Sequence, residues 1–336
     1  VTAIVEAEDG TLWAGTETGG LARCNPAAGD GGVAWRSFGP EDGWPGAPVR
    51  AMAAGRDGSL WIATSSGLFR FDGQTCLAYR QADGLAREDV SSLLVDADGD
   101  IWVGTSDGVQ RLEAGAMAGY DQAAGLEEGK VAQIAAAPDG NVWFLLDDSQ
   151  QRRLLARFDG QRFDQSLRDP TALGLPGVQP NAVVVDRDGA IVVGDAQEAM
   201  ARSLPAESGN RPAFGEPVGP SGATPLLESS SGELWIAVEG GVRVLRRQEG
   251  GDVPSEPDGE AAESDGAEAN PGEEDSGLDE PGLAPLEEAE AGPSDATPPL
   301  VEEVPKAGMI GEVIMAREGA DGMIWFATKA GAIHRW

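Results

Sequence analysis

The chain repeats one short pattern of hydrophobic and polar positions seven times. In the copy around Trp102, residues 90–95 and 101–105 form two aliphatic stretches separated by Asp98-Gly99. Two shorter stretches, 109–112 and 117–120, complete the copy. β-Branched and aromatic residues bounded by Gly turns are typical of strands, and no helical period competes with them. Four short strands in about 40 residues predict one blade of a propeller.

Two positions mark each copy. The first is Trp13, Trp61, Trp102, Trp143, Trp235 or Trp325, with Val192 in that place in the fifth copy. The second, three residues earlier, is Gly10, Gly58, Gly99, Gly140, Gly189, Gly232 or Gly322. Gly adopts positive φ cheaply and closes a tight hairpin. We expect each Trp to fill a slot between neighbouring blades, since its neighbours are aliphatic in every copy; a stacking row for sugars or bases is the alternative.

The spacing of the copies locates an insertion. The Trp places are 41 to 49 residues apart, except for the last step of 90 residues. Residues 249–305 contain no Lys, Arg, His or aromatic residue, and such a composition cannot offset the entropy of ordering. We therefore predict a single all-β domain, 1–336, that is a seven-bladed β-propeller with four-stranded antiparallel blades. Its sixth blade would carry a disordered acidic low-complexity insertion at 249–299, between a third strand at 242–245 and a fourth at 300–304.

The two ends of the chain suggest how the last blade is built. The sequence starts at Val1 directly on an inner strand and stops at Trp336, on what should be a third strand. We therefore expect the seventh blade to lack a fourth strand. The simplest interpretation is a domain excised from a longer chain.

The repeat resembles a known family. Residues 1–23 and 90–112 are similar to the two-component regulator propeller repeat, which has an Asp-x-Asp-Gly turn followed by an aliphatic-Trp-aliphatic-Gly-Thr strand. Copy four departs after Trp143, copy five lacks the Trp and copy six lacks the Asp. The resemblance implies a periplasmic or extracellular input module of a bacterial sensor. Such a module binds a small molecule, a glycan or another protein and passes the event to a signalling domain elsewhere in the full-length chain.

Charge excludes some partners. The net charge is −33, and 19 acidic residues in 249–305 leave about −14 on the remaining chain. Acidity in both parts argues against nucleic acid and against an anionic membrane surface. No stretch approaches 18 apolar residues, so we expect no direct membrane insertion. The two cysteines, Cys24 and Cys76, give no metal signature; free thiols are expected, with a disulfide as the alternative.

The candidate chemistry is sparse. His334 is the sole histidine, which leaves no Ser-His-Asp triad and no zinc site of the His and Cys type. Residues 96–100 superficially resemble a calcium loop, but Trp102 continues a strand where that loop would continue. We therefore expect a non-catalytic protein without metal or cofactor. The alternatives are a scaffold that docks another protein, and a propeller enzyme resembling streptogramin lyase, for which His334 would be the candidate residue.

Propeller geometry places the candidate binding site. Loops that lead into the inner strands share one face, at the channel mouth, with the hairpins between the second and third strands, and rigidly supported loops often carry function. We expect an exposed recognition residue at Trp44, beside Pro45; a cap over blade one or two is the alternative. The candidate ligand- or partner-binding residues on these loops are Trp44, Arg50, Arg87, Glu88, Asp107, Lys130, Arg152 and Asn181.

Overall fold

A computed structural model gives the fold of the chain. It describes residues 1–25, 34–120, 124, 126, 129–164, 180–195, 200–203, 214–218, 222–239, 241–246, 300–303 and 312–336. These residues belong to one compact unit that joins Val1–Arg247 with Pro299–Trp336. The predicted acidic insertion, 249–299, lies outside the described residues.

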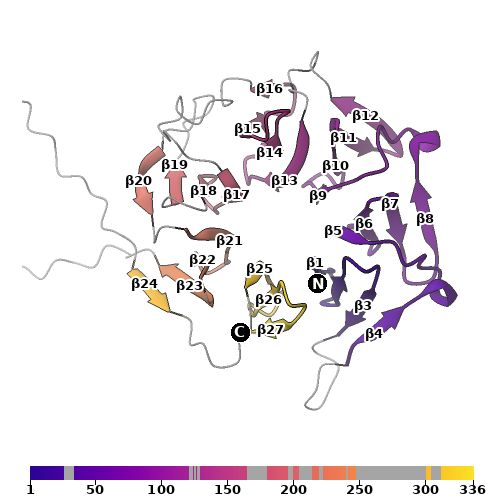
Figure 1. Cartoon of the computed structure of the whole chain (residues 1–336), viewed down its shortest axis with the longest axis horizontal. Helices are drawn as coiled ribbons and strands as arrows, with labels where there is room; N and C mark the ends of the chain where they lie inside the picture. The colour runs from indigo at the N-terminus through magenta and orange to yellow at the C-terminus, as the bar shows by residue number, and fades with distance from the viewer. Residues whose placement is uncertain are drawn as a thin grey trace, which may run out of the picture. The chain divides into compact units, whose positions relative to one another are not determined.

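The unit contains seven antiparallel sheets, each numbered here as a blade in chain order (Figure 1). The strands of blades one to three are β1 (Ala3–Glu6), β2 (Leu12–Gly15), β3 (Leu21–Cys24), β4 (Arg36–Phe38), β5 (Val49–Ala54), β6 (Leu60–Thr64), β7 (Gly67–Phe71), β8 (Cys76–Tyr79), β9 (Ser92–Val95), β10 (Ile101–Thr105), β11 (Gly108–Glu113) and β12 (Ala116–Tyr120). Two short 3₁₀ turns, η1 (Pro40–Asp42) and η2 (Gln81–Asp83), lie between blades.

Blades four to seven continue the series. Their strands are β13 (Lys130–Ala136), β14 (Val142–Asp147), β15 (Arg153–Phe158), β16 (Phe163–Asp164), β17 (Pro180–Val185), β18 (Ile191–Asp195), β19 (Met200–Ser203), β20 (Phe214–Val218), β21 (Thr224–Glu228), β22 (Leu234–Val238), β23 (Gly241–Arg246), β24 (Leu300–Glu303), β25 (Val313–Glu318), β26 (Ile324–Thr328) and β27 (Ile333–Arg335). The seven-bladed all-β prediction is confirmed. Six sheets have four strands, and in the described residues the seventh has three, as the sequence predicted.

The first strand of each blade is its inner strand. Neighbouring inner strands contact one another in the order β1, β5, β9, β13, β17, β21 and β25, and β25 contacts β1. The blades therefore close into a ring, with the inner strands nearest the common centre in Figure 1. Residues on these strands line the central channel wherever the flanking blades do not cover them.

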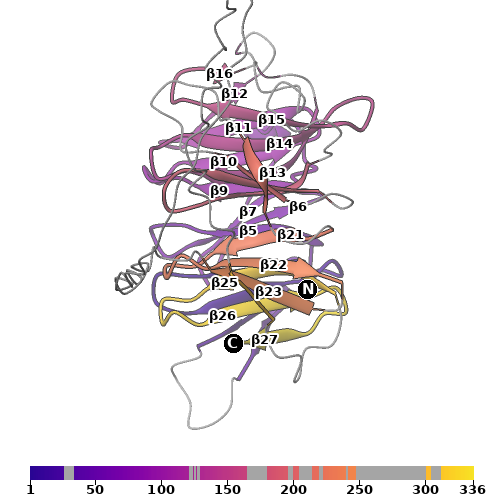
Figure 2. The same ribbon diagram turned by 90° about the vertical axis from the view of Figure 1, so that its left-hand side faces the viewer.

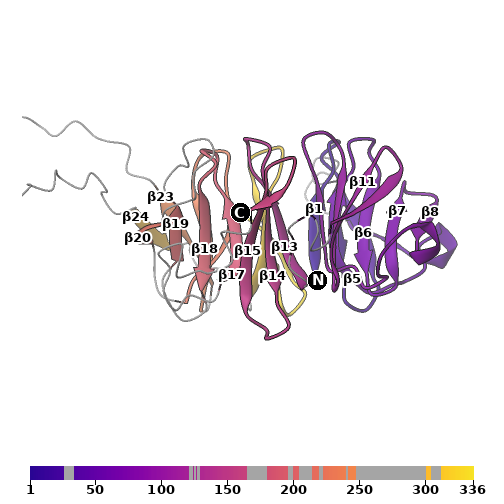
Figure 3. The same ribbon diagram turned by 90° about the horizontal axis from the view of Figure 1, so that it is seen from above.

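Strand register defines two faces of the ring. Ala3 pairs with Gly15, which lies just before the hairpin to β3, whereas Glu6 pairs with Leu12 across the Asp-Gly turn. One face, the loop face, thus holds the loops that lead into inner strands and the hairpins between second and third strands. The other, the turn face, holds the Asp-Gly turns and the connections from third to fourth strands. Figures 2 and 3 show the strands running between the two faces.

The repeated Gly and Trp residues behave as their spacing predicted. All seven repeat glycines have φ between 76° and 89°, the left-handed region that other residues avoid. The six repeat Trp side chains are buried. Trp13 packs against Phe71 of blade two, and Trp235 against Phe326 of blade seven. The Trp row is therefore an interblade packing element, and its burial is incompatible with a sugar-stacking row.

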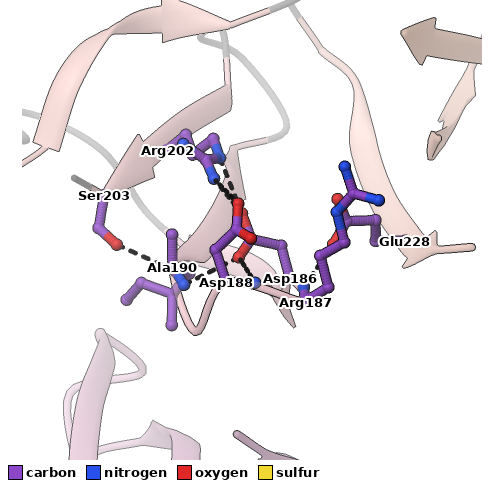
Figure 4. A network of polar contacts seen from close by, with 8 residues as sticks. Asp186, Arg187, Asp188, Ala190, Arg202, Ser203 and Glu228 are labelled. Atoms are coloured by element: carbon purple, nitrogen blue, oxygen red, sulfur yellow. Dashed lines mark hydrogen bonds and ion pairs between the residues drawn. The ribbon is translucent and has the colours of Figure 1, made fainter. Parts of the chain in front are cut away.

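An arginine on the third strand supports most of these turns. It pairs across the sheet with the Trp place in six blades, as Arg23, Arg70, Arg111, Arg157, Arg202 and Arg335. In blade five, Asp186 is almost fully buried at the turn, and its carboxylate accepts backbone N–H bonds from Asp188 and Ala190, both at 2.9 Å. Arg202 completes the network by pairing with the other carboxylate oxygen, with its Nε at 2.9 Å (Figure 4). Each such network ties the third strand to the turn of its own blade.

The equivalent cluster in blade two predicts a loss of stability in acid. Partial burial raises the pKa of Asp57, but hydrogen bonds from Ser59 and the contact with Arg70 outweigh it and lower the pKa to about 2. The folded state then binds this proton less readily than the unfolded chain does, so its contribution is present above about pH 4 and is lost as the pH falls toward 2. We expect Asp57→Asn to flatten the decline in urea midpoint over that range.

Asp98→Asn is the matched control for that measurement. Asp98 occupies the same place in the blade-three turn, but its side chain is 84% exposed. An identical acid decline in wild type and Asp57→Asn would contradict the assignment to Asp57.

Glutamates at the ends of inner strands join successive blades on the turn face. Glu228 accepts the backbone N–H of Arg187 at 2.6 Å, and Glu318 accepts that of Ser230 at 2.6 Å. Glu6 accepts the N–H of Ala320 at 3.0 Å, so the same contact links blade seven to blade one. The ring closure therefore uses the ordinary blade-to-blade contacts, without requiring a fourth strand in blade seven.

Candidate functional site

The loop face surrounds the channel with the starts of the inner strands. Four inner strands carry a β-bulge there, after Val49, Val131, Pro180 and Val313. The extra residues are Arg50, Ala132, Asn181 and Ile314. A bulge frees its residue from the pleat and re-aims the side chain, so sequence variation at this place changes the channel mouth without changing the blade.

Trp44 is not part of an exposed surface, and the prediction that it is exposed is wrong. Its side chain is fully buried, its indole Nε1 donates to the Gly19 carbonyl at 2.8 Å, and its ring packs edge-on against Phe69 at 5.6 Å. Trp44 instead caps the junction of blades one and two.

Several predicted site residues already have a charged partner in the protein. Arg87 forms an ion pair with Asp107, with both side chains about half exposed. Glu88 lies 3.6 Å from Arg80, and Arg152 lies 2.8 Å from Asp148. Surface pairs of this kind contribute little to stability, and each partly neutralises the charge offered to a ligand.

Arg50 and Lys130 differ from these residues. Both are exposed on inner strands, Arg50 at the bulge of β5 and Lys130 at the start of β13. Within the described part of the chain, neither side chain has a hydrogen-bond or ion-pair partner. They are the predicted site residues whose charge is left for a ligand.

Polar groups beside them tie the inner strands together. Thr2 Oγ1 donates to the Val49 carbonyl at 2.6 Å, and Ser91 Oγ to the Val131 carbonyl at 2.6 Å. Asn181 Nδ2 donates to Thr224 Oγ1 at 3.0 Å, while its buried Oδ1 has no partner. The predicted residue Asn181 is thus partly committed to the junction of blades five and six.

The only histidine lies far out in its blade. His334 is on β27, the third strand of blade seven, and pairs with Phe326. Two strands separate it from the channel. Its half-buried ring therefore has no access to a site among the inner strands.

In the described ranges, no group of three or more His, Cys, Asp or Glu residues is placed so that it could hold a metal ion. Cys24 and Cys76 are free thiols, as expected, and burial raises the pKa of each to about 11, which leaves both protonated and poor as nucleophiles or ligands at neutral pH. No helix in the described residues is long and apolar enough to cross a membrane.

Fold and repeat define the class as a seven-bladed β-propeller with an open loop face. Residues 84–107 match the family model described as two component regulator propeller, which confirms the resemblance seen in the sequence. The match covers the second half of the connection from blade two and the first two strands of blade three. No curated protein matches the chain.

Solved structures show the same fold. The extracellular domain of the hybrid two component system BT3049 from B. thetaiotaomicron has a TM-score of 0.65 and 16% identity, covering 100% of this chain and 39% of that one. That of BT4673 from B. thetaiotaomicron has a TM-score of 0.56 and 19% identity, covering 74% and 34%. The chain thus spans between a third and two fifths of these extracellular domains.

An enzyme is also among the similar structures. A catalytically inactive variant of virginiamycin B lyase from Staphylococcus aureus, solved with quinupristin, has a TM-score of 0.64 and 14% identity, covering 99% of this chain and 93% of that one. At such identities these likenesses concern the fold alone.

Proposed function

We propose that the chain is a non-catalytic, extracytoplasmic sensory propeller that binds a small molecule, a glycan or another protein at its loop face. In a longer chain it would pass binding to a signalling domain. The observation that carries the proposal is the pair of exposed inner-strand cations, Arg50 and Lys130, which have no partner in the described residues of a strongly acidic chain. The likeness to extracellular domains of two component systems supports the setting.

The position of His334 supports a non-catalytic role. A lyase that resembled virginiamycin B lyase in mechanism as well as fold would need its reactive groups where a substrate can reach them. The sole histidine is on a third strand, and the described residues show no metal cluster at the channel. In the part of the loop face that the structure describes, the enzymatic alternative therefore has neither a histidine nor a metal cluster to support it.

A second candidate is a scaffold that docks another protein. Two large apolar side chains favour it: Leu77, on the outermost strand of blade two, is 53% exposed, and Trp35 lies exposed beside β4. Exposed apolar residues on outer strands suit a protein partner better than a small molecule.

A thermal-shift screen of saccharides, glycan fragments and metabolites distinguishes the sensory propeller from the protein-docking scaffold. A true ligand at about 100 times its Kd should stabilise the wild type by about 2.7 kcal/mol and thereby raise its Tm. We expect Arg50→Ala to reduce the shift. Arg56→Ala is the matched control, because Arg56 is exposed on the turn face. A full screen without any shift would move the assignment to the scaffold, and equal shifts in both variants would contradict a site at Arg50.

A further inference from the structure

A second unpaired arginine lies deeper in the ring. Arg317 is the fifth residue of the inner strand β25, three residues beyond the bulged Ile314. One edge of β25 pairs with β26, and β21 and β1 contact it from the blades on either side. Arg317 is nevertheless exposed. The surfaces left open to a residue at this place are the central channel and the turn face beyond Glu318.

Arg317 departs from its own repeat. It pairs across the sheet with Trp325. The residues in the same place on the other inner strands are Val5, Ala53, Leu94, Ala135, Val184 and Leu227. Six aliphatic residues and one arginine thus occupy this level of the ring, so blade packing alone does not account for the charge.

Arg317 is exposed, but the protein around it takes away part of its hydration, and this desolvation lowers the pKa of Arg317. Partial loss of hydration favours pairing with an oppositely charged group. In the described residues, Arg317 has neither an ion-pair nor a hydrogen-bond partner.

The neighbouring carboxylates are engaged elsewhere. Glu318 follows Arg317 in the chain, but its carboxylate accepts the backbone N–H of Ser230. Glu6 and Glu228, at the ends of their own inner strands, accept the N–H groups of Ala320 and Arg187. A chain with 57 acidic residues thus leaves this arginine without an acidic partner in the described channel wall.

We infer that the central channel binds a small organic anion, whose carboxylate or sulfate group pairs with the guanidinium of Arg317. Arginine is the suited residue, because its planar donors match two oxygens of an oxyanion at once. At about 3.3 Å per residue, Arg317 lies about 10 Å along the strand from the bulge position. Ile314, 41% exposed at that bulge, supplies an apolar contact, and Arg50 a second cation at the mouth. This inference deepens the proposed function and rests on it.

Titrations with sodium glucuronate and sodium sulfate test the inference, with glucose and sodium chloride at matched ionic strength as controls. Calorimetry and Tm should both show binding of glucuronate or sulfate by the wild type and by Arg56→Gln, which loses the same charge on the turn face. Arg317→Gln should bind about 10-fold more weakly or worse, since a charged hydrogen bond contributes about 1.5 to 3 kcal/mol. Arg317→Lys keeps the charge without the planar fork and should recover part of the affinity.

The outcomes separate the channel site from the proposed function. Equal binding by Arg317→Gln and Arg56→Gln, or no binding of either anion by the wild type, would overturn the anion site. If the wild type binds neither anion but a neutral saccharide stabilises wild type and Arg317→Gln equally, the anion site is overturned and the sensory proposal remains intact. Loss of fold in Arg317→Gln would show in its circular dichroism, and Arg317→Lys then decides the question, because a folded Lys variant that binds neither anion counts against the site.

Discussion

Replacing Trp102 with Ala should lower the free energy of unfolding by about 3 to 5 kcal/mol, the range for a buried aromatic residue. Trp102 is 1% exposed and packs against Tyr120 of its own blade and Phe144 and Phe158 of blade four. Its indole Nε1 also donates to Asp96 at 2.8 Å. The substitution would leave a cavity at the blade junction and a buried carboxylate short of one donor. Urea denaturation followed by circular dichroism measures the loss.

Trp35→Ala is the matched control. Trp35 lies outside the repeat, and its side chain is 36% exposed. We expect a change within about 0.5 kcal/mol, as for most surface substitutions. Comparable losses in the two variants would mean that the repeat Trp does not hold neighbouring blades together.

The repeat explains why the fold could be predicted from the sequence. The copies share the same local pattern, a Gly at positive φ with the Trp place three residues later. One copy alone would predict a blade only weakly, but seven copies in register predict it strongly. The strand predicted at 101–105 coincides with β10, and the one predicted at 109–112 lies within β11. The strands β23 and β24 likewise pair with each other on either side of the predicted insertion.

Trp44 shows where that reasoning stops. It lies in a connection that occurs once, so no other copy could indicate its environment. Its burial depends on Gly19 and Phe69, which are distant in sequence and meet it only when blades one and two pack. A Trp beside a Pro in a polar loop gives no local signal that separates a cap from an exposed recognition residue.

The arginines were missed for a different reason. Five of the third-strand arginines follow the Trp place by nine or ten residues, at 23, 70, 111, 202 and 335, so this signal was present in the sequence. Arg317 was detectable as the one charged residue in an otherwise aliphatic place. The sequence could not show that Arg317 lacks a carboxylate partner. That depends on the directions in which Glu6, Glu228 and Glu318 point in the folded chain.

The arginines of the ring fall into two groups, those paired at the turns and those left unpaired at the channel. On the turn face, the third-strand arginines of blades two, three, five and seven pair with aspartates of their own blade, so they stabilise turns and offer little to a ligand. At the channel, Arg50 and Arg317 lack such partners in the described residues. An arginine that the fold leaves unpaired keeps its guanidinium available to an anionic ligand.

Asp186→Ala should have the second large effect. The carboxylate is 2% exposed and is held by Arg202 and by two backbone N–H groups of the blade-five turn (Figure 4). Removing it leaves those donors unsatisfied and Arg202 with only the more distant carboxylate of Asp188. We expect a loss of about 3 kcal/mol, at the low end for a broken buried pair because Arg202 is 26% exposed and can recruit water.

Asp188→Ala is the matched control for that prediction. Asp188 carries the same charge in the same turn and lies 3.7 Å from Arg202, but it is 45% exposed. If proximity to Arg202 alone set the energy, the two variants would lose similar amounts in urea denaturation. If burial and the backbone donors set it, as the geometry indicates, Asp188→Ala should lose at most about 1 kcal/mol, the usual value of an exposed pair. The difference between the variants therefore measures how much of the turn's stability comes from the desolvated acceptor, and a ratio near one would contradict the network in Figure 4.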